Sequence, residues 1–441
     1  MILDRKFRNK KLINRTILNY QPDLLAFTAV NTEIDYILEI AGYIKKRYNI
    51  FSVLGGIHVT LNASGVYLHT FDALCIGEGE FPLLELADKQ DRNEDINSIA
   101  NLWVKYGKKP KINPPRAFIQ DLDEIPFVDR EIWQPWILDK KSRLTILVGR
   151  GCPYNCTYCC NHSLKKITSG KYVRLRSAES ILAEIKELQD SFPEVLEYYL
   201  EIETLGVNIN WLESLCNILY EYNSHKDKKL FFGANLRVND NMELERVFMN
   251  LGKANFSSVT IGLESGSERV RKEILNRNYS NDTIIKAVKT ARKYGIKVGL
   301  FNIMGIPSET YKEFKETLRM NQLLQPDWHA TSIFYPYEGT ALYKKAKDEG
   351  FLPASIPTAH ERQFALLDLQ DFPRKKIQQE FDSFHFNVYK KNPTKNNLKL
   401  MLYFFQKLVG HNFMANAKIK IIALLYRFRL KTTLVSIFQK L

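Results

Sequence analysis

Residues 144–159 read LTILVGRGCPYNCTYC, and this stretch is the starting point for the fold. The apolar run at 144–148 is typical of a short buried strand. The loop after it holds Cys152, Cys156 and Cys159 in a C-x3-C-x2-C spacing. Three thiolates on one tight loop can close around a single iron–sulfur cluster and leave its fourth iron without a protein ligand. The stretch therefore predicts a metal-binding loop at the carboxyl end of a strand.

A structural zinc site is the alternative for the same cysteines. Such sites usually take four nitrogen or sulfur ligands, and the sequence offers no second C-x2-C pair. His162 could supply the fourth ligand. Cys160 follows the last cysteine of the motif directly, and we expect it to point elsewhere. Cys75 and Cys216 stand in apolar surroundings, so we expect them in the core.

Strand and helix patterns alternate from this loop to about residue 350. The strand candidates are nearly continuous apolar runs, as in parallel strands that are buried on both faces. Six such units predict a partial (β/α)6 TIM-like barrel, short of the eight units of a full barrel. The predicted strands are 144–148, 197–203, 229–237, 258–264, 297–304 and 330–335, with helices near 177–191, 211–224, 240–252, 281–294, 308–324 and 340–349.

The residues before the barrel repeat this pattern on a smaller scale. Strands are predicted at 23–30, 50–54 and 73–76, with helices at 33–48 and from 81 to about 89. Strands that end in glycine turns before helices, here Gly55-Gly56 and Gly77-Glu78-Gly79-Glu80, are typical of a doubly wound sheet. Only about half of such a domain fits here, so we expect an incomplete Rossmann-like domain at 1–105. A Pro- and Gly-rich linker at 106–143, the barrel core at 144–350 and a helical unit at 351–441 complete the expected organisation.

Composition and charge narrow the function. Hydrophobic residues make up 45% and charged residues 25% of the 441 residues, which excludes a disordered or coiled-coil protein. The net charge of +14 divides into +5 for residues 1–20, +12 for 372–441 and −3 for the rest. A nucleic-acid binder usually carries its basic face on the folded core, so no nucleic-acid partner is expected. Six cysteines, three of them within eight residues, and no apolar signal segment favour a cytoplasmic protein.

The cysteine motif, with Tyr158 before its last cysteine, resembles the signature of the radical SAM superfamily. The resemblance implies a [4Fe-4S] cluster held by Cys152, Cys156 and Cys159, and S-adenosylmethionine (SAM) chelated by the open iron. One electron delivered through that iron would cleave SAM and yield a 5′-deoxyadenosyl radical. The cofactors would carry the difficult chemistry, while the protein positions them.

Further motifs resemble the family at the ends of the predicted strands, where barrel active sites are built. Glu203, beside Ile202 where the related subfamily usually has two adjacent Asp, resembles the acceptor of the SAM ammonium group. Arg237 resembles the position near the SAM carboxylate. The other resemblances are the stretch Gly262-Leu-Glu264-Ser-Gly-Ser267 and the stretch Gly305-Ile-Pro-Ser-Glu-Thr310. The SAM contacts implied are Tyr158, Glu203, Arg237, Glu264, Ser267 and Gly305.

The N-terminal glycine turns resemble the cobalamin-binding domain that precedes the barrel in one large radical SAM class. That class carries an Asp-x-His-x-x-Gly loop whose histidine ligates cobalt, and this sequence has none. His58 and His69 lie in the wrong segment. Two alternatives stay open: a purely structural domain, or a domain that binds cobalamin without a histidine ligand. Without cobalamin, hydrogen abstraction is favoured over methyl transfer from cobalt.

The resemblance implies an enzyme that starts radical chemistry, whether methylation, cyclisation, deoxygenation or rearrangement, with a flavodoxin- or ferredoxin-type reductant. Its alternatives are a cobalamin-dependent radical SAM methyltransferase and a catalytically silent cluster-binding partner protein. An RNA-modifying methylthiotransferase would add a second three-cysteine cluster and an RNA-binding barrel, and the sequence shows neither.

The C-terminal unit combines apolar runs with Lys and Arg at 398–409 and 419–430. We expect these runs to pack on the barrel. The alternative is a peripheral contact with a membrane or an anionic, apolar substrate. A small-molecule or lipid-like substrate is expected, with Tyr335 and Tyr337 facing it.

Overall fold

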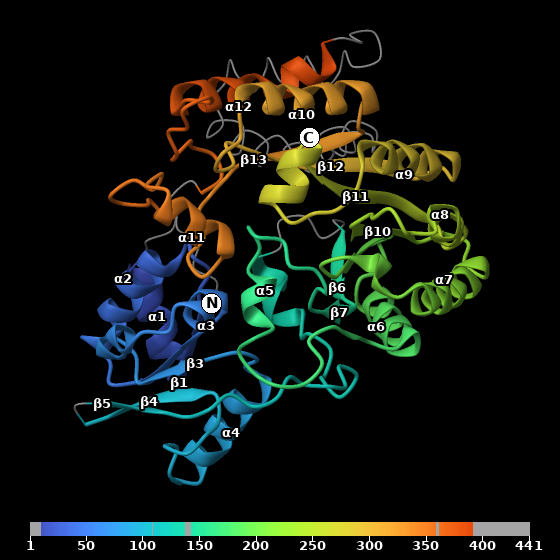
Figure 1. The fold of residues 1–441 in the computed structure, drawn as a ribbon. Coiled ribbons are helices and arrows are strands. Elements are labelled where there is room, and N and C mark those ends of the chain that lie inside the picture. Colours follow the sequence, from blue (N-terminus) through green and yellow to red (C-terminus); the bar gives the residue numbers. More distant parts are fainter. Residues whose placement is uncertain (1–9, 108, 137–142, 359–360, 391–441) are drawn as a thin grey trace.

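Two sheets organise the described residues of this computed structural model, which are 10–107, 109–136, 143–358 and 361–390. A five-stranded N-terminal sheet lies beside a six-stranded sheet (Figure 1). The described part of the chain contains no helix that is long and apolar enough to cross a membrane.

The six-stranded sheet confirms the expected partial (β/α)6 barrel. Its order is β13-β12-β11-β10-β9-β6, and every neighbouring pair is parallel. Apolar residues such as Ile146, Leu200 and Ile261 are fully buried between this sheet and its helices. The strands are β6 (Leu144–Leu147), β9 (Glu197–Glu201), β10 (Phe231–Leu236), β11 (Phe256–Glu264), β12 (Lys297–Met304) and β13 (Trp328–Ile333).

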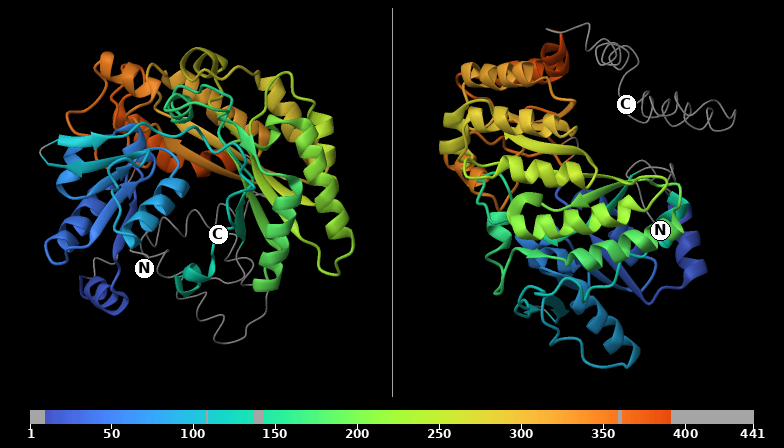
Figure 2. Two further views of the ribbon diagram at one scale, coloured as in Figure 1. Left: turned by 90° about the horizontal axis from the view of Figure 1, so that it is seen from below. Right: turned by 90° about the vertical axis from the view of Figure 1, so that its right-hand side faces the viewer.

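Helices cover the outer face of this sheet (Figure 2). Local capping fixes where several of them begin: Ser177, Asn208 and Ser280 accept a backbone N–H in the first turn, and Thr310 forms a capping box with Glu313. The helices are α5 (Asn161–Leu164), α6 (Ala178–Ser191), α7 (Ile209–Ser224), α8 (Leu244–Lys253), α9 (Asn281–Lys293), α10 (Tyr311–Leu324) and α11 (Ala341–Asp348), with short turns η2 (Glu131–Trp136), η3 (Leu205–Val207) and η4 (Val270–Ile274).

The N-terminal sheet has the order β1-β2-β3-β4-β5, and its first three strands are parallel. The strands are β1 (Leu24–Thr28), β2 (Phe51–Gly55), β3 (Ala73–Cys75), β4 (Leu102–Tyr106) and β5 (Lys109–Ile112). The helical elements are α1 (Lys10–Tyr20), α2 (Ile34–Lys45), α3 (Ile57–Leu61), η1 (Gly65–His69) and α4 (Glu80–Asp91).

One strand lies where the sequence predicted an irregular linker. β5 pairs antiparallel with β4, so the N-terminal sheet continues past residue 105 to Ile112. The sequence pattern did not predict this strand because Pro110 lies within it. A proline is tolerated there because β5 is the edge strand, where one backbone N–H faces no partner.

The chain ends, as far as it is described, in α12 (Arg374–Tyr389), which packs beside α10. Phe384 and Val388 of α12 join the core cluster that contains Phe314 of α10. The described part of the C-terminal unit therefore contains a helix, as expected. The basic apolar runs at 398–409 and 419–430 lie outside the described residues.

Candidate active site

The cysteine loop begins at a backbone position that only glycine fits. After β6, the short strand β7 (Gly149–Arg150) pairs antiparallel with β8 (Arg174–Leu175). Gly151 then has a φ of +86°, and a Cβ at this position would lie 2.1 Å from the carbonyl oxygen of Tyr172. This close approach turns the chain sharply into Cys152. The loop lies at the carboxyl end of the barrel, as predicted (Figure 1).

Two arginines face the buried sulfur of Cys156. The Arg237 Nη1 atom donates to Cys156 Sγ at 2.9 Å, and the Arg277 Nη1 atom lies 3.9 Å from the same sulfur. The Arg237 guanidinium also lies 3.5 Å from the ring centroid of Tyr154, a cation–π arrangement. Positive charge next to a cysteine favours its thiolate form, which is the form that binds metal.

Cys159 lies in a second donor-rich environment. Its sulfur accepts a hydrogen bond of 3.4 Å from the Asn161 side-chain amide. A hydrogen bond from the Cys160 thiol lowers the pKa of Cys159 to about 6. Burial, in contrast, raises the pKa of Cys152 to about 11.

This donor set fits an iron–sulfur cluster. Three cysteines stand on one loop, and the sulfurs of Cys156 and Cys159 already accept N–H groups of the kind that stabilise bound thiolates. His162, the conceivable fourth zinc ligand, instead accepts the backbone N–H of Ala341 through Nε2. Within the described ranges, no three His, Cys, Asp or Glu side chains, these cysteines included, stand close enough together to hold a single metal ion.

Arg277 connects the cysteine loop to Glu264, although no sequence motif pointed to this residue. Its Nη1 atom lies 3.1 Å from Glu264 Oε1 and donates to the Tyr158 hydroxyl at 2.8 Å. Its other nitrogens donate to the Tyr279 hydroxyl and the carbonyl of Gly262. Glu264 itself has a φ of +60°, a strained backbone conformation for a residue other than glycine. The network holds the ends of the cysteine loop and of β11 in one place.

Glu203 lies beside the start of the loop, where its Oε1 atom accepts the backbone N–H of Gly151 at 3.1 Å. It lines a cavity of about 270 Å³ that also contains Gly56, Gly77, Tyr172 and Arg174. The structure thus places Glu203, Arg237 and Glu264 around the same cysteine loop.

Ser267 and Gly305 lie apart from these groups. The Ser267 hydroxyl donates to Glu313 and accepts the N–H of Val270. Gly305 has a φ of +68° and its N–H donates to Glu309, which closes the turn after β12. Neither residue lines a described cavity next to the cysteines.

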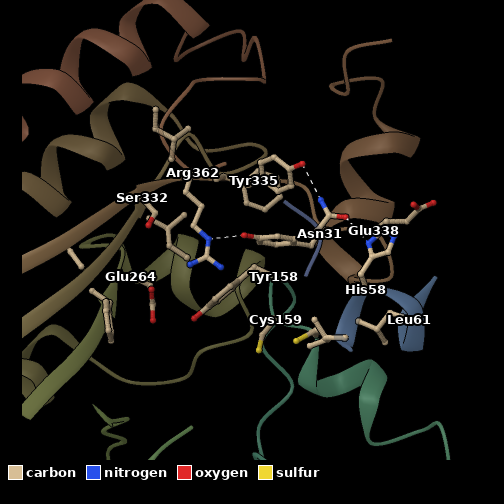
Figure 3. Close-up of a pocket in the computed structure, with 18 of the residues that line it drawn as sticks. Asn31, His58, Leu61, Tyr158, Cys159, Glu264, Ser332, Tyr335, Glu338 and Arg362 are labelled. Atoms are coloured by element: carbon tan, nitrogen blue, oxygen red, sulfur yellow. Dashed lines mark hydrogen bonds between the residues drawn. The ribbon is translucent and has the colours of Figure 1, made fainter. Parts of the chain in front are cut away.

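The largest space beside the loop is a cavity of about 380 Å³ between the barrel and the N-terminal sheet, which we call the interdomain cavity (Figure 3). Cys159 and Cys160 form part of its wall. The sequence expectation that Tyr335 and Tyr337 face a substrate agrees with their place in the lining. The full lining is Asn31, Ile57, His58, Leu61, Asn62, Tyr158, Cys159, Cys160, Glu264, Phe301, Asn302, Ile303, Ala330, Ser332, Ile333, Phe334, Tyr335, Tyr337, Glu338 and Arg362.

A polar chain closes the N-terminal side of this cavity. His58 Nδ1 lies 3.1 Å from Asn31 Oδ1, and its Nε2 lies 2.8 Å from the Tyr67 hydroxyl. Asn31 Nδ2 in turn donates to the Tyr335 hydroxyl of the barrel. Burial lowers the pKa of His58, so its ring is neutral and both of its nitrogens are in use. Sequence reasoning missed Asn31, because a lone Asn after a strand carries no chemical signal.

The glycine pair after β2 serves chain packing. A Cβ on Gly56 would lie 2.7 Å from the backbone nitrogen and oxygen of Ala29. By resemblance, the sequence linked these glycine turns to a cobalamin-binding domain. The close approach found is to the chain itself.

Comparisons with known proteins agree with this site. Residues 146–320 match the family model of the Radical SAM superfamily. The chain is 28% identical over 356 residues to an uncharacterized methyltransferase of Pyrococcus horikoshii, a match that covers 76% of this chain and 71% of the relative. It is 25% identical over 348 residues to the anaerobic magnesium-protoporphyrin IX monomethyl ester cyclase of Rubrivivax gelatinosus, which covers 76% of this chain and 60% of the relative.

A solved structure shares the fold of most of the chain. It is the radical S-adenosylmethionine methyltransferase TsrM from Kitasatospora setae with cobalamin and a [4Fe-4S] cluster bound. The TM-score is 0.69 at 14% identity, over 90% of this chain and 83% of TsrM. At this identity the likeness concerns the fold.

A partial TIM-like barrel that carries a three-cysteine loop is the architecture of an iron–sulfur enzyme. Residues 146–320 are a radical SAM domain, so the protein is a radical SAM enzyme, a class that uses a [4Fe-4S] cluster and SAM.

Proposed function

We propose that this enzyme acts on a small organic molecule held in the interdomain cavity, and that its first step on the substrate removes a hydrogen atom. The position of the cavity carries this proposal. Its wall includes Tyr158 and Cys159 of the cysteine loop, and Tyr335 lies on another side. A substrate bound there would lie next to the site of SAM cleavage.

The residues of the chain would divide the work by position. Cys152, Cys156 and Cys159 would hold the cluster, which when bound supplies the electron that cleaves SAM and starts the radical chemistry. Glu203 and Arg237 would bind the ammonium and carboxylate groups of SAM. Of the other candidate SAM contacts, Tyr158 and Glu264 line the cavity. Ser267 and Gly305 would act indirectly, by holding the turns that follow their strands.

The test is SAM cleavage by anaerobically reconstituted protein with dithionite. We expect 5′-deoxyadenosine as a product, detected by mass spectrometry. Cys156→Ala should lose both iron and product, whereas Cys216→Ala, in the core on α7, should keep its iron. A fully loaded protein that releases no 5′-deoxyadenosine would instead favour the catalytically silent alternative.

Cobalamin-dependent methyl transfer is the second candidate, and the likeness to the cobalamin-bound TsrM fold favours it. The contacts of the N-terminal domain argue for the first candidate. α3 packs against α5, so the space between the domains is divided into cavities of about 380 and 270 Å³. Ordinary ligand pockets span roughly 300–1,000 Å³, and a corrinoid is much larger than the ligands that they hold.

The absorption spectrum of protein reconstituted with iron, sulfide and hydroxocobalamin separates the two candidates. After desalting, a cluster band alone supports hydrogen abstraction. A retained cobalamin band, together with S-adenosylhomocysteine among the products, would support methyl transfer.

A flavodoxin- or ferredoxin-type protein would deliver the electron, and residence in the cytoplasm stays a prediction from the cysteine pattern. Peripheral membrane contact through the basic residues at 372–441 is a further proposal. Flotation with anionic liposomes at physiological salt tests it, and absence of binding would end it.

A further inference from the structure

The cavity contains one side chain that the radical SAM resemblance does not explain. Arg362 lies in the irregular segment between α11 and α12, and its side chain reaches into the interdomain cavity on the side of Tyr158 and Glu264 (Figure 3). It comes from outside the barrel strands that carry the candidate SAM contacts. Its role therefore needs an explanation of its own.

The backbone and one edge of the guanidinium are fixed. Arg362 has a φ of +63°, a left-handed backbone conformation that is strained for a residue with a Cβ. Its carbonyl accepts the N–H of Ile333 at the end of β13. Its Nε atom donates to the Tyr337 hydroxyl at 2.7 Å, and that hydroxyl donates to Glu361 at 2.6 Å. The strained backbone and these partners hold the side chain in the cavity.

The other edge of the guanidinium has no protein acceptor in the part of the chain that is described, and with 54% of the side chain exposed it lies at the open mouth of the cavity. Glu361 lies on the Nε side, at 3.4 Å. Glu264, the other carboxylate on that side of the cavity, is paired with Arg277. The Nη1 and Nη2 atoms of Arg362 therefore offer two parallel N–H donors, the geometry that binds a carboxylate or another oxyanion in bidentate fashion.

The rest of the wall around this donor pair is mostly apolar. It includes Ile57, Leu61, Phe301, Ile303, Ile333 and Phe334. Apolar surface favours a hydrocarbon or aromatic body in the same space, with few polar groups to fix its orientation.

We propose that Arg362 binds the anionic group of the substrate, which is an apolar organic molecule that carries one carboxylate or similar oxyanion. The inference rests on the proposed function for the place of the substrate, but the binding site itself is independent of turnover. Tyr337 is a positioning residue, because it holds the Nε edge and leaves the Nη edge to the ligand.

Two fluorescent probes that differ by one anionic group test this on reconstituted protein with SAM bound. 1-Anilinonaphthalene-8-sulfonate carries a sulfonate, and N-phenyl-1-naphthylamine is its neutral analogue. We expect Arg362→Gln to weaken binding of the sulfonate about tenfold or more, as for loss of a charge-assisted hydrogen bond. Binding of the neutral probe should change less than about twofold, since the apolar wall remains.

Matched variants and competitors sharpen the result. Tyr337→Phe keeps the guanidinium and should produce a smaller, selective loss of the sulfonate probe. Arg292→Gln, outside the barrel on α9, should change neither affinity. Octanoate should displace the sulfonate probe better than octanol at equal concentration.

Three results would overturn the inference. They are an unchanged affinity of Arg362→Gln for the sulfonate, an equal loss for both probes, and competition between SAM and the sulfonate, which would assign Arg362 to SAM itself. Failure of the proposed function would appear differently: no 5′-deoxyadenosine would form, while Arg362→Gln would still bind the sulfonate probe more weakly than the neutral probe.

Discussion

At the scale of single residues, the side chains around Cys156 should influence the reduction potential of the cluster, although they lie outside the cysteine motif. Cys156 has two guanidinium groups within hydrogen-bonding reach of its sulfur, and Cys159 has an amide. Reduction adds negative charge to a cluster, so nearby positive charge favours the reduced form. The reduction potential should therefore depend on residues that touch no substrate.

Arg277→Gln tests this dependence. Loss of its charge near Cys156 should lower the cluster potential, so that about tenfold fewer clusters are reduced at a given solution potential, ~59 mV for one electron. A redox titration followed by electron paramagnetic resonance measures the shift, and Arg277→Lys should recover part of it.

Arg271→Gln is the matched control, because Arg271 is 0% exposed and its guanidinium donates to backbone carbonyls of Ser265 and Tyr279. It should retain the potential of the wild type in whatever protein loads a cluster. Equal shifts in both variants would mean that general loosening of the site, rather than the charge beside Cys156, changes the potential.

At the scale of elements, ion pairs connect the N-terminal domain to the two short strands beside the cysteine loop. Glu78, in the turn before α4, binds Arg150 of β7 and Arg174 of β8, each at 2.9 Å. It also accepts the backbone N–H of Ile119. The two strands that frame the start of the cysteine loop are thus tied to the other sheet.

Glu78→Gln should destabilise the protein by about 3 kcal/mol at pH 7, because the buried Arg174 loses its charge partner. Burial would raise the pKa of Glu78, but the bonds from Arg174, Ile119 and Arg150 outweigh it and lower that pKa. A lowered folded pKa gives stability that is present above the unfolded value of about 4.5 and is lost as the pH falls below it.

Urea unfolding at a series of pH values checks both effects. The wild type should lose more stability than Glu78→Gln as the pH falls from about 5 to about 3. Glu245→Gln, which breaks an exposed pair with Lys293, should change stability little. Parallel pH profiles of the wild type and Glu78→Gln would contradict the argument.

The elements themselves were largely predictable from sequence, whereas the site was predictable only in part. β12 begins and ends at the predicted residues 297 and 304, since its apolar run is bounded by clear turn signals. The three cysteines of the loop are recognisable in the sequence by their spacing. Arg277 and Arg362 do not, because their roles come from contacts with residues far away in the sequence. β5 was not predicted because its sequence is polar and contains Pro110.

At the scale of the whole molecule, the two sheets have separate cores and meet through polar contacts. Apolar clusters lie within the barrel and within the N-terminal sheet. Between them run the Glu78 ion pairs, the bond from Asn31 to Tyr335, and a bond from Thr358 to Asp35. Polar interfaces of this kind allow one domain to open while the other stays folded.

Amide hydrogen exchange should therefore show β2 opening at a lower free energy than β11. Asn31→Ala removes the interdomain hydrogen bond to Tyr335, worth about 1 kcal/mol, so exchange in β2 should accelerate roughly fivefold while β11 is unchanged. Asn223→Ala, whose amide binds the Leu230 carbonyl inside the barrel, should do the reverse. Equal acceleration of both strands by either variant would show that the two sheets unfold as one unit, and the interdomain cavity would then be as rigid as the barrel itself.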